Sequence, residues 1–422
     1  MEYRGLDQVL DLIIDHRGKT APKLGGRWEN EGIPVISANN LRDGQFVEMD
    51  SVKHIRKQLF NKWMPTELEE GDVLLVSEGA TFGQVLYLRR KIQAAVGQRL
   101  FALRCSDSYL GRYLYYYLKS RIGQSELNSR TTGTSVLGIR QSELTKIRVP
   151  NIQKEVQRGI SDVLGSIDDK ILLNCEMNKT LERMGQLIFK HWFIDFEFPN
   201  DEGKPYKSLG GEMVYNEELG KEIPKGWDVR PLNEFGEVIC GKTPPKSDKR
   251  FFGGSVPFIR IPDMHNQLFV IDTEDSLTED GKKYQDSKTL PMGSVCVSCI
   301  ATIGLVSITS EESQTNQQIN SIVPFDERSR YYLFFQMKSM KRDLEDMGSG
   351  GSTTLNINTN SFSNIRIICP KQGSMKEFHE TVKALFGRLL NNSIESRSLS
   401  QIRDSVLPKL MSGKVRVSIE GR

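Results

Sequence analysis

Residues 156–192 have the sequence VQRGISDVLGSIDDKILLNCEMNKTLERMGQLIFKHW, in which apolar side chains recur at steps of three and four. This spacing predicts one long helix over residues 151–194. The apolar face comprises Val156, Ile160, Leu164, Ile167, Ile171, Leu181, Ile188 and Trp192, with Asn174 and Asn178 on the same side. A helix of about 40 residues extends roughly 60 Å, which favours a coiled-coil spacer over the alternative, an ordinary core helix.

A second segment repeats this pattern 218 residues later and predicts a helix over residues 371–411. Its apolar positions are Phe378, Val382, Leu385, Leu389, Leu399, Val406 and Leu410. We expect the helices to pack antiparallel with Asn174 facing Asn392, because a buried asparagine weakens a coil but fixes its register. The alternative is that both asparagines lie at a solvated edge. The expected arrangement also pairs Ile160 with Val406, and Ile188 with Phe378.

The rest of the chain is an internal repeat with an offset near 220 residues. The landmarks that recur in order are Gly18–Lys23 with Gly241–Lys246, Ile33–Ile36 with Val256–Ile259, Gly71–Leu74 with Gly293–Cys296, Ala80–Gly83 with Ala301–Gly304, Gly97–Gln98 with Asn316–Gln317, Thr131–Ser135 with Gly350–Thr354, and Ile147–Pro150 with Ile367–Pro370. A single match of this kind is weak, since glycine and proline occur at turns everywhere. The shared order predicts two domains of one fold.

Each repeat contains short β-branched segments bounded by turn residues, such as residues 72–77 and 295–298, which predict strands. One helix is expected over 109–119 and its counterpart over 330–340. The fold class is therefore mixed α/β (α+β), with two globular domains joined by two long helices in an antiparallel coiled coil, as a pseudo-twofold repeat. The expected boundaries are 1–150, 151–194 (helix), 195–222 (linker), 223–370, 371–411 (helix) and 412–422 (tail).

Composition sets few limits on function. A chain of 422 residues exceeds what one core usually holds. The net charge is only +3, although Lys and Arg outnumber Asp and Glu by 22 to 17 in residues 1–150 and by 10 to 5 in residues 371–422. Residues 223–370 carry 16 basic against 18 acidic side chains. Nucleic-acid binding would therefore depend on local basic patches or on a basic partner.

The location expected from the sequence is the cytoplasm. No apolar run is long enough to span a bilayer, and acidic residues interrupt the N-terminal segment where a signal peptide would be apolar. Six scattered cysteines are typical of reduced thiols rather than of a disulfide framework.

Residues 236–243, GEVICGKT, match the phosphate-binding loop pattern G-x-x-x-x-G-K-[ST]. In that loop a helix starts at the Lys-Thr end and directs backbone N–H groups at phosphates. Here Pro244-Pro245 follows at once and removes two of those donors. The first repeat has Ile13 in place of the leading glycine. A P-loop ATPase is therefore kept as an alternative, and a turn that presents Lys242 to a DNA phosphate is preferred.

Other patterns for catalysis or metal binding are weak. Cys296 and Cys299 form a lone C-x-x-C pair without a nearby histidine, which favours buried thiols in a strand over zinc. Residues 262–263 and 280–282 fit a metal-dependent nuclease pattern only loosely, and the five histidines lack metal-ligand spacing. The Asn-Pro-Pro-aromatic tetrapeptide of amino-methyltransferases does not occur. We expect no catalytic residue, metal or cofactor on this chain.

Two domains, each followed by a long helix of the same phase, resemble the specificity (S) subunit of type I restriction–modification systems over essentially the whole chain. The strings that carry the resemblance are residues 132–135 (TGTS) ahead of 147–150, residues 189–196 (FKHWFIDF) and residues 407–417 (LPKLMSGKVRV). The resemblance implies that 1–150 and 223–370 are target-recognition domains, each reading one half of a bipartite, asymmetric DNA site, with the helices holding the halves apart.

The resemblance also implies the partners. They are double-stranded DNA, two methyltransferase subunits that use S-adenosylmethionine to methylate adenine N6, and restriction subunits that translocate DNA. S-adenosylmethionine, ATP and Mg would then be bound by partner subunits, and this chain would be a non-catalytic subunit. The acidic balance of the second repeat is a departure that puts in doubt how much phosphate contact it makes unaided.

DNA-contacting side chains should be exposed polar and basic residues on the loops at the repeat landmarks. In the first repeat the candidates are Arg17, Lys19, Lys23, Arg27, Asn39, Arg42, Arg130, Thr132, Thr134 and Ser135. In the second they are Lys242, Lys246, Lys249, Arg250, Arg260, Ser352, Thr353 and Asn356. Arg and Asn can form paired hydrogen bonds with guanine and adenine edges, whereas Lys more often contacts phosphate. For each candidate the alternative is an ordinary solvated side chain.

Besides the ATPase, one rival function stays open. Two binding domains on a coiled coil could gather proteins rather than DNA. Protection of one bipartite DNA sequence, together with a methyltransferase partner, would exclude that adaptor.

Overall fold

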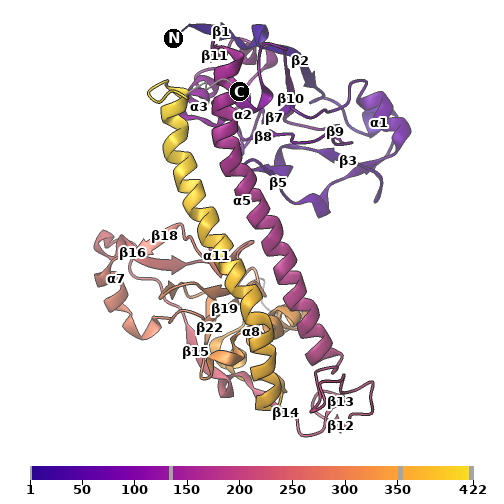
Figure 1. Cartoon of the computed structure of the whole chain (residues 1–422), viewed down its shortest axis with the longest axis vertical. Coiled ribbons are helices and arrows are strands. Elements are labelled where there is room, and N and C mark those ends of the chain that lie inside the picture. The colour runs from indigo at the N-terminus through magenta and orange to yellow at the C-terminus, as the bar shows by residue number, and fades with distance from the viewer. Residues whose placement is uncertain (1, 133–135, 350–354, 418–422) are drawn as a thin grey trace. The chain divides into compact units, whose positions relative to one another are not determined.

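The computed structural model describes residues 2–132, 136–349 and 355–417, and the chain divides into two compact units (Figure 1). The first unit comprises Met1–Lys170 together with Leu399–Arg422, and the second comprises Ile171–Ser398. The first unit is therefore assembled from two segments that are far apart in the sequence. Each unit contains one of the two repeats and a part of each long helix.

The first unit is a mixed α/β domain. Its strands are β1 Tyr3–Gly5, β2 Leu10–Asp15, β3 Ile33–Ile36, β4 Leu41–Arg42, β5 Gln45–Phe46, β6 His54–Ile55, β7 Val73–Val76, β8 Val85–Tyr87, β9 Ala95–Val96, β10 Leu100–Cys105 and β11 Arg148–Pro150. Its shorter helices are α1 Lys57–Trp63, α2 Gly111–Lys119, α3 Arg121–Asn128 and α4 Gln141–Leu144. The main sheet has the order β2-β10-β7-β8, beside smaller sheets β6-β3-β9, β1-β11 and β4-β5.

Strand β7 explains why this domain has two hydrophobic cores. All four of its residues are buried, and successive side chains of a strand point to opposite faces. Val73 and Leu75 belong to the core that contains the tyrosines of α2, whereas Leu74 and Val76 belong to the core that contains Trp63 of α1. A continuous apolar run is thus the expected sequence for a strand covered on both faces.

The second unit is also mixed α/β. Its strands are β12 Met213–Asn216, β13 Lys221–Pro224, β14 Asp228–Pro231, β15 Gly236–Cys240, β16 Phe252–Ile259, β17 Phe269–Val270, β18 Asp275–Leu277, β19 Val295–Ser298, β20 Val306–Thr309, β21 Gln314–Thr315, β22 Ile319–Pro324 and β23 Arg366–Cys369. Its shorter helices are α6 Ile261–Met264, α7 Glu279–Tyr284, α8 Arg330–Ser339, α9 Lys341–Gly348 and α10 Thr359–Ser363. The main sheet has the order β15-β22-β19-β20-β17, beside β18-β16-β21, β14-β23 and β12-β13.

The two units repeat one topology. The order β2-β10-β7-β8 in the first corresponds strand for strand to β15-β22-β19-β20 in the second, and β17 is an addition at one edge. Helices α2 and α8 occupy the two segments in which one helix per repeat was expected. The predicted fold class and internal repeat are confirmed.

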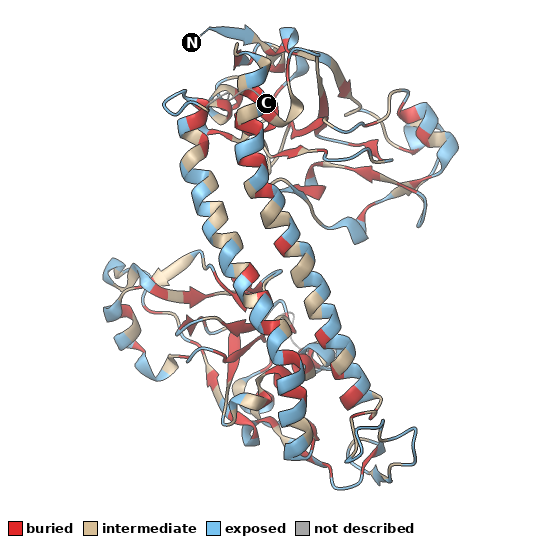
Figure 2. Ribbon diagram, viewed as in Figure 1, coloured by how far each residue is buried: buried red, intermediate tan, exposed pale blue. Residues whose placement is uncertain are grey.

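The two long helices are α5, Lys154–Phe189, which continues as a turn of π-helix to Ile194, and α11, Gln372–Met411. They run antiparallel within each unit. In the first unit Asp168 of α5 pairs with Arg403 of α11, and in the second Phe189 packs against Phe378. Buried residues recur along both helices among exposed ones, as expected for a two-stranded seam (Figure 2). In the described residues, neither these helices nor any other is apolar enough over a sufficient length to cross a bilayer.

The asparagines of the seam lie in the second unit, where Asn174 contacts the backbone of Asn392 and each side-chain amide makes its shorter hydrogen bond with a residue about one helical turn further along. The Asn392 amide donates to Asn178 Oδ1 at 2.9 Å, and the Asn174 amide donates to Glu395 Oε2 at 2.8 Å. Asn174 Nδ2 also contacts the backbone oxygen of Asn392 at 3.4 Å and Ser396 Oγ at 3.3 Å. The two amides do not bond to each other, because antiparallel helices pair one heptad position with a different one rather than like with like.

The hydrogen bond between Asn178 and Asn392 should contribute to the free energy of unfolding. Asn392→Leu should leave the Asn178 carbonyl without its donor, whereas Asn178→Leu/Asn392→Leu removes both polar groups. A double-mutant cycle measured by urea unfolding should therefore give a coupling free energy of about 1 kcal/mol. Thr180→Ala, on the exposed face of α5, serves as the control and should change stability little. Additive losses in the cycle would contradict the bond.

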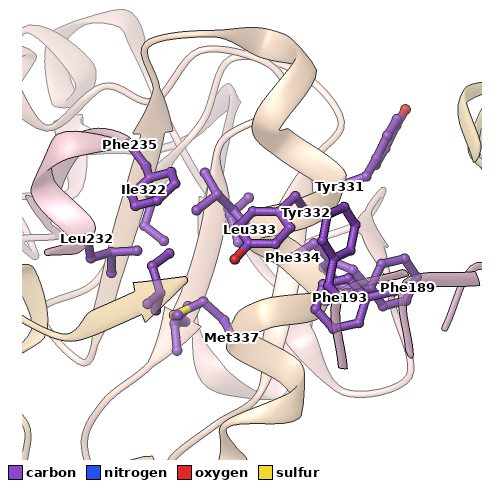
Figure 3. Close-up of a cluster of buried hydrophobic side chains, with 14 of the residues drawn as sticks. Phe189, Phe193, Leu232, Phe235, Ile322, Tyr331, Tyr332, Leu333, Phe334 and Met337 are labelled. Atoms are coloured by element: carbon purple, nitrogen blue, oxygen red, sulfur yellow. The ribbon is translucent and has the colours of Figure 1, made fainter. Parts of the chain in front are cut away.

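An aromatic cluster closes the second unit at the end of α5 (Figure 3). Phe193 lies 4.9 Å from the Tyr332 ring and 5.0 Å from the Phe378 ring, both in edge-on geometry. The segment expected to be a surface linker, residues 195–222, also contributes, because Phe198 stacks on Trp227 at 4.7 Å. Most of its other side chains are exposed or half-buried, and its end forms the hairpin of β12 and β13.

Candidate nucleic-acid interface

Arg17 is held inside the first unit. Its Nε and Nη2 donate to the two carboxylate oxygens of Asp15 at 2.8 and 2.7 Å, and Nη1 donates to the backbone oxygen of Ile139 at 3.1 Å. The guanidinium also lies 4.1 Å from the centre of the Phe101 ring. With its donors engaged in this way, Arg17 is better suited to holding the loop after β2 than to contacting a base.

The lysines of the same loop differ from each other. Lys19 Nζ donates to the backbone oxygen of Trp63 at 2.8 Å, and burial lowers the pKa of Lys19. Lys19 therefore ties the loop to the end of α1. Lys23 is exposed, and in the described residues its side-chain amine makes one hydrogen bond, of 3.2 Å, to the backbone oxygen of Gly18. Lys23 remains free to meet a phosphate.

Further along the first unit, three candidates lie at the surface. Asn39 is exposed in the turn after β3, and Arg42 is exposed with Glu48 at 3.7 Å. Arg27 is exposed as well, with Nε donating to Glu29 at 3.1 Å. These three side chains are therefore accessible to a ligand.

Arg130 and Thr132 precede the loop that carries the TGTS string. Thr132 is exposed and its backbone forms a bridge to Gly138, whereas Arg130 is half-buried with Nη2 at 3.7 Å from Glu126. The Arg130 Nε atom is buried without a hydrogen-bond partner in the described part of the chain. Thr134 and Ser135 lie outside the described residues.

Among the candidates of the second unit, Arg260 is engaged in ion pairs and is mostly shielded from solvent. It pairs with Glu274 at 2.5 Å and with Asp275 at 3.1 Å, and its side chain is largely buried. This placement favours a structural role. The exposed candidates are Lys242, Lys246, Lys249, Arg250 and Asn356. Ser352 and Thr353 lie outside the described residues.

Two of the exposed cations in the second unit have fixed positions. Arg250 donates to both carboxylate oxygens of Asp248, at 3.0 and 2.8 Å. Lys242 Nζ lies 5.3 Å from the centre of the Tyr284 ring, a cation–π distance. Both side chains thus reach solvent with a preferred direction, which lowers the entropy lost when they bind a ligand.

The segment that matches the phosphate-binding loop is not a loop. Residues 236–240 are strand β15, which pairs antiparallel with β22 along its whole length, so every second N–H group of this segment faces β22. Cys296 and Cys299 are buried, and burial raises the pKa of each thiol to about 11. In the described residues no group of three or more potential metal ligands comes together.

The structure adds residues that the sequence analysis missed. A cleft of about 330 Å³ in the first unit lies between the loop 25–29 and helix α1. Its polar walls are Arg27 and Glu29 on the loop side, and Arg56, Gln58 and Lys62 on the helix side. We call it the arginine cleft. Only Arg27 of this set was a candidate, because Glu29 is acidic, and Arg56, Gln58 and Lys62 lie far along the chain with no local pattern that joins them to Arg27.

Charges in the arginine cleft are unbalanced towards the positive. Arg27 Nε and Arg56 Nε both lie against Glu29 Oε1, at 3.1 and 2.7 Å. The Arg27 hydrogen bond, followed by the charges of Arg27 and Arg56, lowers the pKa of Glu29, so its carboxylate is ionised at neutral pH. With Lys62 the cleft holds three cations and one anion, an arrangement suited to an anionic ligand.

Comparison with known proteins gives consistent matches. The family model described as the type I restriction modification DNA specificity domain matches residues 1–183 and again 224–398. The specificity subunit of the type I restriction enzyme HindI from Haemophilus influenzae is 41% identical over 310 residues, which cover 62% of this chain and 68% of that protein. The MjaIX specificity subunit from Methanocaldococcus jannaschii is 27% identical over 411 residues, covering 94% and 89%.

A solved structure has the same fold. The crystal structure of the type I restriction–modification S subunit from M. genitalium superposes with a TM-score of 0.58 and covers 97% of this chain and 95% of its own. At 16% identity this likeness concerns the fold alone.

Proposed function

The chain belongs to the family of type I restriction–modification specificity subunits, and from this we propose that it is the DNA-reading subunit of such a complex, each unit recognising one half of a bipartite, asymmetric site. Residues 1–150 and 223–370 are the two target-recognition domains, and residues 151–194 and 371–411 are the spacer helices. Residues 195–222 link the halves, and residues 412–422 form a tail.

The observation that carries this proposal is the duplication. Both units have the strand order of one sheet in common, yet their exposed loop residues differ. Arg42 and Asn39 follow β3 in the first unit, whereas the residue that follows β16 in the second, Arg260, is engaged with two carboxylates. Two scaffolds of one kind with different polar surfaces suit two different half-sites, since base edges are distinguished by side-chain hydrogen bonds.

Catalysis in this proposal occurs on partner chains. Two methyltransferase subunits would use S-adenosylmethionine to methylate adenine, and restriction subunits would use ATP and Mg to translocate and cut. This chain would direct both activities by placing them on one sequence. The P-loop alternative is disfavoured by the strand conformation of residues 236–240, and by the N–H groups of Gly241 and Lys242, which donate to the backbone oxygens of Ile319 and Thr315 instead of facing a ligand.

A change in one unit should affect one half-site. Arg250→Ala is expected to weaken DNA binding by about 1–3 kcal/mol if the guanidinium contacts a guanine edge, and to relax specificity at that base pair alone. Lys242→Ala should weaken binding to all sequences alike, since a lysine on phosphate carries no sequence information. Sequencing of methylated adenines in cells carrying each variant, with filter binding in parallel, measures both effects.

Lys225→Ala is the matched control for these variants. Lys225 is an exposed cation of the same unit whose partner is Glu212, on the β12–β13 hairpin side. It should leave the methylated sequence and the affinity unchanged. Altered recognition of both half-sites by Arg250→Ala would sink the proposal of one reader per unit, and wild-type protein that selects no bipartite sequence would favour the protein-gathering adaptor.

A further inference from the structure

We propose that the arginine cleft of the first unit is a DNA-contact site in which Arg27 and Arg56 together grip one backbone phosphate and Gln58 contacts a base edge of the first half-site. This inference rests on the proposed function and adds residues to it. The cleft lies between loop 25–29 and helix α1 and belongs to the first unit alone.

The two walls of the cleft are fixed against each other. Lys62 Nζ, from the last turn of α1, donates to the backbone oxygen of Leu24 at 2.8 Å. Gly26 lies so close to Leu59 that a Cβ added there would be 2.5 Å from a Leu59 methyl carbon. With no side chain at residue 26, the Leu59 side chain can lie directly against the loop. A site with fixed walls loses little conformational entropy when a ligand enters.

The guanidinium groups of Arg27 and Arg56 are held by Glu29 but keep N–H donors without a partner within the described part of the chain. One comes from each wall, and both direct Nε at Glu29, which is half-buried. In the described residues, the terminal nitrogens of Arg27 and Arg56 donate no hydrogen bond. The Arg27 side chain is 75% exposed and the Arg56 side chain is 67% exposed. A guanidinium has five N–H donors in a rigid fork. Each arginine therefore has free donors on the side away from Glu29.

A phosphate oxygen matches this donor set. Glu29 offsets one positive charge and acts as a positioning residue, while Arg27, Arg56 and Lys62 leave a net charge of about +2 for the ligand, and paired guanidinium donors suit phosphate geometry. Gln58 is exposed on the first turn of α1, and its amide forms no hydrogen bond within the described part of the chain. An amide offers one donor and one acceptor, the pair that recognises the N7 and N6 atoms of adenine.

The corresponding place in the second unit lacks this arrangement. There the loop before β16 packs on α7, with Gly281 close to the backbone oxygen of Phe251. Helix α7, however, begins with Glu279 and Asp280, and Arg250 is paired with its own Asp248. The close approach of loop and helix is thus common to both units, whereas the paired arginines are particular to the first. Phosphate contact through this loop should be stronger in the first unit.

The test uses the full-length chain purified with the methyltransferase of its own system. Selection from a pool of randomised duplexes first gives the bound sequence, and that duplex and a scrambled one are the probes. Arg56→Gln should weaken binding to both probes about tenfold and reduce the salt slope by about one, because one phosphate contact is lost. Gln58→Ala should lose preference at one base pair of one half-site by about tenfold while the salt slope stays unchanged.

Lys146→Ala provides the matched control, since Lys146 is an exposed cation of the same unit paired with Glu143 on the α4 side. It should behave as wild type, and far-ultraviolet circular dichroism checks that every variant is folded. Arg56→Gln with the wild-type affinity and salt slope, or Gln58→Ala with an unchanged selected sequence, would overturn the inference. Neither outcome contradicts the proposed function. The proposed function fails if the wild-type protein selects no bipartite duplex.

Discussion

Phe193→Ala is expected to lower the free energy of unfolding by about 3–5 kcal/mol. The Phe193 side chain is 1% exposed, and its ring meets the rings of Tyr332 and Phe378 edge-on. It also lies 5.8 Å from the Trp227 ring, at the point where the end of α5 joins the second domain. Removing the ring leaves a cavity among side chains from several elements, which cannot all move to fill it.

Urea titration followed by tryptophan fluorescence measures this loss, because Trp192 and Trp227 lie in the same cluster. Phe325→Ala is the matched control. The Phe325 side chain is 71% exposed, so its truncation should change the free energy by about 0.5 kcal/mol or less. Equal losses for the two variants would show that the ring cluster does not stabilise the second unit.

Arg403→Met should cost about 3 kcal/mol in the first unit, because it leaves a buried carboxylate without its counter-charge. Arg403 Nη1 donates to Asp168 Oδ1 at 2.8 Å, and the Tyr116 hydroxyl donates to Oδ2 at 2.7 Å. Side-chain exposures of 15% for Arg403 and 9% for Asp168 keep water from replacing the lost donor. Burial, followed by the charge of Asp168, raises the pKa of Tyr116, so its hydroxyl remains a donor.

The double variant Asp168→Leu/Arg403→Met should recover most of this loss, since replacing both members of a buried ion pair by apolar groups is often close to neutral. Arg397→Met is the control on the same helix. Arg397 pairs with Asp272 at 2.7 Å with side-chain exposures of 40% and 60%, and pairs that are this accessible to water contribute about 0–1 kcal/mol. Additive losses for Asp168→Leu and Arg403→Met in thermal unfolding would argue against a coupled pair.

The sequence predicted the architecture better than it predicted contacts between elements. The steps of three and four along residues 156–192 were enough for α5, and the ordered landmarks were enough for the repeated sheet. Asn174 does contact Asn392, but only through the Asn392 backbone oxygen, and the shorter side-chain hydrogen bonds of the two asparagines are made with Glu395 and Asn178. Periodicity defines which face of a helix is buried, but the axial position of its partner depends on how side chains interlock across the seam.

Prediction of the site was limited in a similar way. Exposed cations such as Lys23 and Lys246 could be expected from composition and turn signals, whereas Arg17 is engaged by Asp15, two residues before it. The same Asp-x-Arg spacing pairs Asp248 with Arg250, and it is a local signal that could have been used. The arginine cleft could not be found from sequence, since Arg27 and Arg56 come together only when the loop packs on α1.

The first unit contains residues from both ends of the chain, and this affects how it folds during synthesis on the ribosome. Leu407, Leu410 and Met411 are buried in the same core as Val73 and Leu75, yet they are translated more than 200 residues after Lys170. At usual elongation rates, an interval of about 10 to 45 s separates the two segments. During that interval the nascent first domain exposes apolar surface that residues 399–417 cover later, so we expect chaperones to bind this domain while the rest of the chain is being made.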